Sequence, residues 1–354
     1  MKNILVTGFP GFLAGFLVKR LAERAERIHL LVEERFAEKA ETLSGRIAIE
    51  IGRPISLFRV VPGDIAREGL GLAEKARDEL LAEADTVFHL AAIYDLAMGR
   101  EIGMKVNVAG TENVNAFVRR MRALARYHYI STAFVAGDVS GAVREDDFFV
   151  GQRFRNFYEE TKHLAEKAVR QMLAEFPVTI FRPTVVVGHS RTGYTVKYDG
   201  PYMALRMIRR LPGFLGRVNF GTDHPFNIVP IDFIVDAMVA IAQRPDSARR
   251  TFHLGQPAPM TSREIAELFC RIVKGKGTWG KVPSWVMRAG QHIPAVPWIL
   301  GVPRQTVPYF YADIQFDCSG TLDMLAGTGV SCPRLSDYAE NIVRYYLEHP
   351  VPGA

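Results

Sequence analysis

The stretch Met1–Phe36, MKNILVTGFPGFLAGFLVKRLAERAERIHLLVEERF, decides the fold of this chain of 354 residues. The apolar run Ile4–Thr7 predicts a strand, and Gly8-Phe9-Pro10-Gly11 breaks it before an amphipathic segment, Phe12–Ala25, begins. Gly8 permits a tight turn, and Gly11 leaves room for a phosphate at the start of the helix, where free N–H groups favour anions. The order of strand, glycine loop and helix therefore predicts a dinucleotide-binding unit.

Short apolar runs alternate with helical patterns through the first 188 residues. Strict alternation of this kind implies right-handed βαβ units and a parallel sheet that is covered by helices on both faces. We therefore expect an α/β fold built on a Rossmann-type doubly wound parallel sheet. The expected strands are Ile4–Thr7, Ile28–Val32, Phe58–Val61, Thr86–Leu90, Tyr127–Ser131 and Val178–Arg182. The clearest expected helices are Phe12–Ala25, Val106–Arg120 and Tyr158–Glu175.

The alternation is lost after Gly188. Residues 189–227 are rich in Gly, Arg, Tyr and Phe, and residues 278–312 contain all three tryptophans. Open α/β sheets bind their ligands at the carboxyl ends of the strands. We expect a NAD(P)-binding domain of residues 1–188 plus 228–257, and a smaller, discontinuous substrate-binding region of residues 189–227 plus 258–354 on the C-terminal side.

Composition limits the classes of function. No uncharged apolar run reaches 18 residues, and no signal peptide precedes the first strand, so we expect neither a transmembrane segment nor export. Three cysteines (Cys270, Cys318, Cys332) form no CxxC pair, which favours a cytoplasmic protein without a metal site. The net charge of +6 indicates either a solvated surface or attraction to anionic cofactors, acyl carriers or lipid headgroups. We expect no nucleic-acid partner.

Glu33 stands at the tip of the second expected strand. A carboxylate there accepts hydrogen bonds from both hydroxyls of the adenosine ribose and repels a 2′-phosphate, so NAD(H) is favoured over NADP(H). Arg35 leaves the opposite interpretation open, because a guanidinium two residues later can hold that phosphate. The third interpretation of Glu33 is a solvated loop charge.

Further cofactor contacts are expected where later strands end. Asp64 in VVPGDI is placed to accept from the adenine amine, and a turn-forming Asp is the competing interpretation. Asn107 is a poor helix former inside a helical pattern, so we expect it to bond backbone across the sheet. The small residues that end VFHLAA let the backbone approach the cofactor. The residues expected to contact the cofactor up to this point of the chain are Gly8, Pro10, Gly11, Phe12, Leu13, Glu33, Arg35, Asp64, Ile65, Leu90, Ala91, Ala92 and Asn107.

Three side chains form the expected catalytic set. Thr132 ends the fifth strand in YISTAFVAG, and Tyr158 and Lys162 follow in YEETK, one helical turn apart on one face. We expect Tyr158 to protonate a carbonyl oxygen as hydride arrives, with Thr132 hydrogen-bonded to the same oxygen. Lys162 is expected to lower the Tyr158 pKa from ~10 and to hold the nicotinamide ribose. A Tyr and Lys at this spacing also occur on ordinary amphipathic helices.

In this order, the motifs TGFPGFLA, GDI, HLAA, NVAGT, STAFVAG, YEETK and FRPTVVVG resemble those of the extended short-chain dehydrogenases/reductases. The resemblance implies that Pro183, Thr184 and Val185 lie beside the nicotinamide. The segments IHLLVEERFAEKAETL, GDIAREGLGL and DGPY are most similar to fatty acyl-CoA reductases and thioester reductase domains of the male-sterility type. Those relatives usually carry an arginine where this chain has Glu33, and a third glycine is replaced here by Ala14.

The resemblance implies an NAD(P)-dependent oxidoreductase that reduces a fatty acyl thioester or aldehyde, with the apolar substrate carried on CoA or an acyl carrier. The aromatic segment 278–312 is expected either to line an acyl or sterol cleft or to be core. Peripheral membrane contact is a further option, although five prolines argue against one long interfacial helix: Pro283, Pro294, Pro297, Pro303 and Pro308. A homodimer is compatible with these expectations.

Three alternatives stay open at this point. A hydroxysteroid-type dehydrogenase would use the same side chains on a secondary alcohol or ketone. A sugar-nucleotide epimerase or dehydratase ranks lower, because few polar or basic residues are recognisable as a grip for a nucleotide sugar. A dinucleotide-binding sensor without turnover would not need the set of Thr132, Tyr158 and Lys162.

Overall fold

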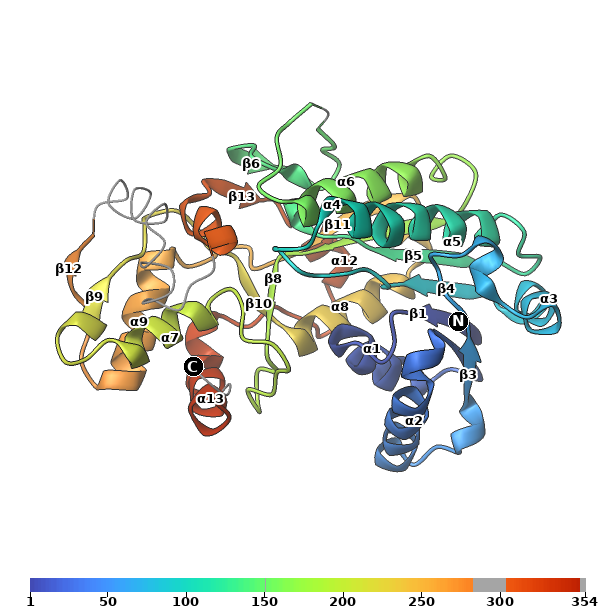
Figure 1. Cartoon of the computed structure of the whole chain (residues 1–354), viewed down its shortest axis with the longest axis horizontal. Helices are drawn as coiled ribbons and strands as arrows, with labels where there is room; N and C mark the ends of the chain where they lie inside the picture. Colours follow the sequence, from blue (N-terminus) through green and yellow to red (C-terminus); the bar gives the residue numbers. More distant parts are fainter. Residues whose placement is uncertain (150, 283–303, 351–354) are drawn as a thin grey trace.

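A computed structural model describes residues 1–149, 151–282 and 304–350. At its centre is a parallel sheet of seven strands in the order β11-β7-β5-β4-β1-β2-β3 (Figure 1). The strands are β1 (Asn3–Thr7), β2 (Arg27–Val32), β3 (Phe58–Pro62), β4 (Thr86–His89), β5 (Arg126–Ile130), β7 (Val178–Pro183) and β11 (Arg250–Leu254). The Rossmann-type sheet is confirmed, and each of the six expected strands is present to within one residue at either end.

Helices cover both faces of this sheet. On one face lie α1 (Phe12–Ala22), α2 (Ala37–Ile51) and α8 (Ile231–Ala242), and on the other α3 (Glu74–Glu83), α5 (Gly110–Val118) and α6 (Phe157–Arg170) (Figure 1). Successive side chains of a strand point to opposite faces, and β1 accordingly sends Ile4 and Val6 into one core cluster and Leu5 into the other. Both faces are buried, as in other wholly parallel sheets.

The expected helices differ from the observed ones mainly at their ends. The α6 helix begins after Asn156, whose side-chain oxygen accepts the N–H of Glu159 at 3.0 Å, and it ends at Arg170 instead of Glu175. The segment Val106–Arg120 is not one regular helix. Val106 lies inside a π-helical turn, Met104–Ala109, which follows α4 (Arg100–Gly103), and α5 begins only after that turn.

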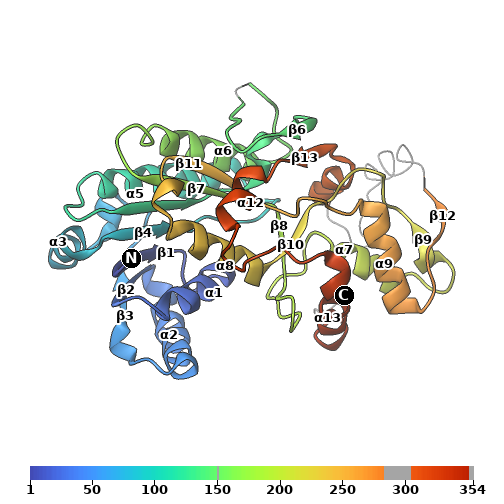
Figure 2. The same ribbon diagram turned by 180° about the vertical axis from the view of Figure 1, so that it is seen from behind.

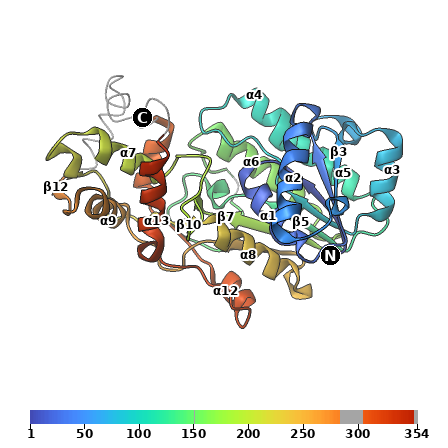
Figure 3. The ribbon, with the colours of Figure 1, turned by 90° about the horizontal axis from the view of Figure 1, so that it is seen from below.

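A second group of elements lies at the end of the molecule away from α2 and α3 (Figures 2 and 3). It contains α7 (Tyr202–Arg210), α9 (Ser262–Lys274) and α13 (Leu335–Glu348), which share a core around Tyr202, Phe269 and Ile342. Short parallel pairs join β8 (Val185–Val187) to β10 (Ile228–Pro230), β9 (Val218–Asn219) to β12 (Trp279–Lys281), and β6 (Gly141–Val143) to β13 (Ile314–Phe316).

The division of the chain into two regions stays a prediction. Within the segment assigned to substrate binding, α12 (Ser319–Leu325) packs against α8 and β11 of the Rossmann side. Several residues of the expected aromatic cleft lie outside the described residues, namely Trp285, Trp298, Pro283, Pro294, Pro297 and Pro303. In the described ranges, no helix has the length and apolar character needed to cross a membrane.

Candidate active site

The glycine loop after β1 is pressed against the end of β4. Gly8 has φ +90°, and a Cβ atom on it would lie 2.8 Å from the amide nitrogen of Ala91. The N–H of Gly11 donates to the Gly8 carbonyl at 2.9 Å and closes the turn. Gly11 offers no capping side chain to the first N–H groups of α1, those of Phe12 and Leu13 included. The loop therefore fits the pyrophosphate of a dinucleotide, which needs close backbone and free amide donors.

A buried hydrogen-bond chain fixes this loop to β4. The Thr7 hydroxyl lies 2.7 Å from Nδ1 of His89 and accepts the Ala91 N–H at 3.1 Å. The Thr111 hydroxyl donates to the Asn107 carbonyl at 2.7 Å, so it accepts from Nε2 of His89, 3.1 Å away. Burial, with a smaller effect of Lys162, lowers the His89 pKa to about 3. His89 is therefore neutral, with its proton on Nε2.

Glu33 and Arg35 form an ion pair where β2 ends. Arg35 Nε lies 2.8 Å from a carboxylate oxygen of Glu33, and the side chains are 70% and 43% exposed for Arg35 and Glu33. The Arg35 guanidinium also lies over the ring of Phe36, 4.7 Å from its centroid. Glu33 and Arg35, the two residues expected to bind the adenosine ribose or its phosphate, are thus both at the tip of β2 and are paired with each other.

Asp64 and Asn107 both bond to backbone. One carboxylate oxygen of Asp64 accepts the Ala66 N–H at 2.8 Å, as in the turn-forming interpretation, and its contact with adenine stays a prediction. The Asn107 side-chain oxygen Oδ1 accepts the Ile93 N–H at 2.8 Å, so Asn107 does bond backbone as expected, although in the loop after β4 instead of across the sheet. Its amide also donates to the Thr161 hydroxyl at 3.1 Å, so Asn107 connects the loop after β4 to α6.

Thr132 and Tyr158 meet at the carboxyl edge of the sheet. The Thr132 hydroxyl is close enough to the Tyr158 hydroxyl to act on its pKa, and the Tyr94 and Tyr158 rings form a T-shaped contact with centroids 5.0 Å apart. Burial raises the pKa of Tyr158 above its ordinary value, and the neighbouring Thr132 hydroxyl only partly offsets this. The two side chains are therefore together at this edge, and their roles as proton donor and supporting hydroxyl stay predictions.

Lys162 does not act on Tyr158 as the sequence suggested. Its ammonium donates to the Tyr129 hydroxyl at 2.9 Å and to the Ile130 carbonyl at 2.8 Å. Burial lowers the Lys162 pKa to about 7. The prediction that Lys162 lowers the Tyr158 pKa is therefore wrong for this structure, because burial dominates at Tyr158 and two of the three lysine N–H groups donate to β5.

A buried ion network behind Lys162 was missed in the sequence. Glu166, one turn later on α6, is fully buried and accepts from Ser131 at 2.6 Å and from Arg182 at 2.7 Å. Burial opposes ionisation of Glu166, yet Arg182 and Arg170 together hold its pKa at about 2. The available signal was a Glu at i+4 from Lys162, on the face that α6 turns to the sheet.

A second group that was missed in the sequence adjoins Tyr158. The Asp199 carboxyl, in the DGPY motif, lies near the Tyr94 hydroxyl, and Lys197 donates to the Tyr94 backbone carbonyl at 3.2 Å. Burial raises the pKa of Asp199 and of Tyr94. The loop 193–200 is thereby held next to the candidate proton donor.

The segment Pro183–Val185 runs out of the sheet beside this loop. Pro183 ends β7, and the Thr184 hydroxyl donates to the Asn227 side-chain oxygen at 3.1 Å. A Cβ atom on Gly200 would lie 3.0 Å from the side chain of Val185. These positions agree with the expectation of a nicotinamide neighbour, which stays a prediction.

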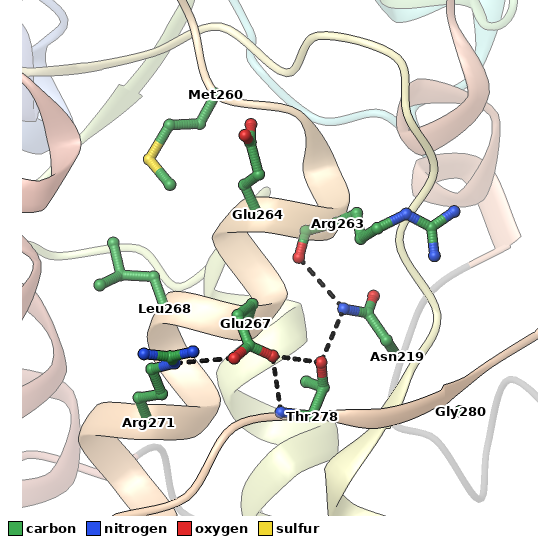
Figure 4. Close-up of a pocket in the computed structure, with 9 residues that line it drawn as sticks. All are labelled: Asn219, Met260, Arg263, Glu264, Glu267, Leu268, Arg271, Thr278 and Gly280. Atoms are coloured by element: carbon green, nitrogen blue, oxygen red, sulfur yellow. Dashed lines mark hydrogen bonds and ion pairs between the residues drawn. The ribbon is translucent and has the colours of Figure 1, made fainter.

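A pocket of about 680 Å³ lies elsewhere, along α9 (Figure 4). In it Glu267 accepts from Arg271 at 2.7 Å and from the Thr278 N–H at 2.6 Å (Figure 4). None of its lining residues belongs to the predicted site: Asn219, Met260, Arg263, Glu264, Glu267, Leu268, Arg271, Thr278 and Gly280. Over the described ranges, no three His, Cys, Asp or Glu side chains are grouped as metal ligands.

Comparison with known proteins finds relatives that agree with one another in family. Residues 6–238 match the family model described as male sterility protein, an NAD-binding family. The chain is 25% identical over 278 residues to the fatty acyl-CoA reductase wat of Drosophila melanogaster, covering 68% of this chain and 54% of that protein. It is 24% identical over 359 residues to the alcohol-forming fatty acyl-CoA reductase of Simmondsia chinensis, covering 78% of this chain and 71% of that protein. The chain thus spans about half the length of the first of these relatives.

A solved structure extends the similarity to nearly the whole chain. The terminal R domain from the myxalamid PKS-NRPS biosynthetic pathway has a TM-score of 0.82 and 26% identity. The match covers 98% of this chain and 91% of that domain. The C-terminal elements after residue 238, which lie beyond the family model, therefore also have a counterpart of similar fold.

Proposed function

Because the chain belongs to the male sterility protein family of extended short-chain dehydrogenases/reductases, we propose that it reduces an acyl thioester with NAD(P)H. The observation that carries the proposal is that the Thr132 and Tyr158 hydroxyls meet at the carboxyl edge of the sheet, with Lys162 one turn from Tyr158 on the same helix. The glycine loop that fits a pyrophosphate lies at the same edge of the sheet, where parallel α/β sheets bind ligands.

The roles of the side chains follow from their protonation states. Tyr158 keeps its proton at neutral pH because burial raises its pKa, so it is a proton donor to the substrate carbonyl oxygen. Thr132 donates a second hydrogen bond to that oxygen as negative charge develops there. When bound, the nicotinamide supplies the hydride that the carbonyl carbon receives. The resulting hemithioacetal breaks its C–S bond and yields an aldehyde and a thiol.

Lys162 is proposed to bind the nicotinamide ribose. Two of its N–H groups are directed at Tyr129 and Ile130, which leaves its third N–H for a ribose hydroxyl. A lysine with a pKa of about 7 is only partly charged at neutral pH, so its ribose bond is expected to depend on pH.

Glu33 supports a preference for NAD(H). The 2′-phosphate of NADP(H) at the β2 tip would be repelled by the Glu33 carboxylate. Arg35 could bind that phosphate only by leaving its ion pair with Glu33. The two ribose hydroxyls of NAD instead donate to Glu33 without disturbing the pair. Asp64 and the residues of the β4 end are proposed to contact the rest of the adenosine and ribose.

The proposed substrate is a long apolar acyl group on CoA or on an acyl carrier. Support comes from the acyl-CoA reductase relatives and from the aromatic ring of Tyr94, which packs against Tyr158. Each buried methylene contributes about 0.8 kcal/mol, so kcat/KM should rise with chain length until the site is filled. A cytoplasmic location and a homodimer stay predictions.

A turnover screen tests the proposal. NADH and NADPH oxidation is followed with acyl-CoAs of increasing length, with long-chain aldehydes, with ketosteroids and with nucleotide sugars. We expect turnover of acyl-CoAs that increases with chain length. Turnover confined to ketosteroids or nucleotide sugars would replace this assignment with one of the alternatives.

A further inference from the structure

Positive charge is concentrated in two segments of the chain. Residues 200–222 and 268–312 contain ten Lys and Arg and no Asp or Glu, whereas the remaining residues contain 34 Lys and Arg and 38 Asp and Glu. The net charge of +6 therefore arises entirely from these two segments. Their basic residues are Arg206, Arg209, Arg210, Arg217, Arg271, Lys274, Lys276, Lys281, Arg288 and Arg304.

The fold brings the described parts of both segments to one end of the molecule. The α7 helix packs on α9, and β9 pairs with β12 so that Val218 lies opposite Trp279. Arg217 Nε donates to the Gly277 carbonyl at 2.8 Å, across the same junction. Figures 1 and 3 show these elements at the end of the molecule opposite α2 and α3.

Aromatic side chains are exposed at this basic end. Phe214 is 63% exposed and Trp279 45% exposed, and their ring centroids are 5.6 Å apart. The Trp279 indole N–H donates to the Phe214 carbonyl at 2.6 Å, so the polar atom of the indole is satisfied while its ring faces solvent. Leu215, beside them, is 43% exposed. We define the basic-aromatic patch as Phe214, Leu215 and Trp279 with Arg209, Arg210, Lys274 and Lys276.

We propose that the basic-aromatic patch docks the protein on an anionic lipid surface. Trp and Phe rings with a satisfied polar atom favour the headgroup level of a bilayer, and Lys and Arg beside them bind lipid phosphates. Because neither segment contains Asp or Glu, no carboxylate within them would repel the anionic lipid headgroups. Of the acidic residues on α9, Glu264 and Glu267 line the pocket, where Glu267 accepts from Arg271 and from Thr278 (Figure 4).

The patch fits a lipid surface better than an acidic protein. The apolar residues lie on the turn between α7 and β9 and on a two-stranded pair, and none of them lines the pocket along α9. Insertion of a turn into the headgroup region needs no shape-matched partner, and the basic residues need only phosphate. This inference does not depend on the proposed reaction.

Vesicle sedimentation with the full chain tests the proposal. We expect the protein to bind phosphatidylcholine vesicles that contain 30 mol% phosphatidylserine, and to be released by high salt, as the screening of charges requires. Lys274→Glu/Lys276→Glu should weaken this binding at least tenfold, and Phe214→Ser/Trp279→Ser should weaken it comparably. The matched control is Arg119→Glu/Arg120→Glu, an exposed basic pair at the end of α5, which should bind vesicles like the wild type.

Cofactor binding by each variant shows that the Rossmann domain is folded, since the patch lies at the other end of the molecule. Equal binding to pure phosphatidylcholine would overturn the proposal, as would an equal loss in the Arg119/Arg120 control. Failure of the wild type to bind either vesicle, with capture by polyglutamate instead, would assign the patch to an acidic protein and overturn it too.

Discussion

The ammonium nitrogen of Lys162 lies 2.9 Å from the hydroxyl oxygen of Tyr129 and 4.5 Å from the centroid of that ring. Tyr129 is on β5 and Lys162 on α6, and both side chains are buried. The phenol therefore gives the lysine a hydrogen-bond acceptor and a cation–π contact at the same time. This relationship fixes Lys162 in place without any contribution from the candidate proton donor.

Replacement of Tyr129 by Phe removes the acceptor and keeps the ring. The protonated form of Lys162 loses one hydrogen bond, so its pKa should fall below about 7. We expect cofactor binding at neutral pH to weaken by about tenfold or more, because a hydrogen bond to a charged group contributes about 1.5–3 kcal/mol and ~1.4 kcal/mol is a factor of ten. The pH dependence of cofactor affinity, measured by titration, should shift to lower pH.

Tyr127→Phe is the matched control for this substitution. Tyr127 is buried two residues earlier on the same face of β5, and its hydroxyl donates to Asn115 at 2.9 Å instead of contacting Lys162. It should lose stability without a shift in the pH dependence of cofactor binding. Equal shifts in both variants would mean that Tyr129 is structural only.

The Glu33–Arg35 ion pair makes cofactor choice testable. We expect NADH to bind about tenfold more tightly than NADPH, a difference of ~1.4 kcal/mol, because the phosphate of NADPH approaches the Glu33 carboxylate. Glu33→Arg should reverse this order. Fluorescence titration of both cofactors into the wild type and the variant measures the effect.

Arg35→Gln separates the two interpretations of this pair. If Glu33 reads the ribose, the variant should bind NADH as the wild type does and NADPH more weakly still. Tighter or equal binding of NADPH by the wild type, lost in Arg35→Gln, would show that Arg35 holds the phosphate and that Glu33 is a solvated charge.

The sheet, and the presence of the candidate catalytic residues at one edge of it, could be predicted because each rests on a local pattern. An apolar strand followed by glycines, and Tyr158 and Lys162 one turn apart, are readable from neighbouring residues. The partners of these residues come from distant segments. Tyr129 is 33 residues from Lys162, and Asp199 reaches Tyr94 from a loop with no regular period, so their contacts depend on tertiary packing.

The prediction that Lys162 lowers the Tyr158 pKa was wrong for the same reason, because tertiary packing decides the surroundings of both side chains. Helical spacing shows that Tyr158 and Lys162 share a face, but it does not show how deeply each is buried or which acceptors compete for the lysine. The Ile130 carbonyl and the Tyr129 hydroxyl are those acceptors. The helix that would contain Asn107 was likewise interrupted by a π-helical turn that the sequence pattern does not reveal.

Glu166→Gln should be strongly destabilising. It leaves the guanidinium of Arg182 buried without its charge partner, and breaking such a pair costs about 3–5 kcal/mol. Glu160→Gln on the same helix removes an exposed pair with Arg100 and should cost less than about 1 kcal/mol. Urea unfolding of both variants provides the comparison, and a similar small loss in each would contradict the buried network.

Acid should destabilise the protein through its buried histidines. His128 is fully buried between the rings of Phe88 and Phe181, and burial lowers its pKa well below the usual range. In the unfolded chain His128 binds a proton near pH ~6.5, whereas in the folded protein it stays neutral. The free energy of unfolding is therefore unaffected by His128 above that pH, and it falls by about 1.4 kcal/mol for each pH unit below it.

His128→Leu should therefore flatten the dependence of stability on pH below about 6.5 by that amount. Urea unfolding at pH 8, 6 and 5 measures the slope for wild type and variant. The values at pH 8, where the histidine is neutral in both states, correct for the change in packing. An unchanged slope would show that His128 is protonated in the folded protein.

The most direct test of thioester reduction follows both products of one reaction. The protein is given a long-chain acyl-CoA and cofactor deuterated at the transferable position, and free CoA thiol, aldehyde and oxidised cofactor are quantified together. We predict one thiol released per cofactor oxidised, deuterium on the aldehyde carbon, and a loss of at least ~10²-fold in rate for Tyr158→Phe with cofactor binding retained. Oxidation of cofactor without thiol release, or near-normal turnover by Tyr158→Phe, would contradict the account.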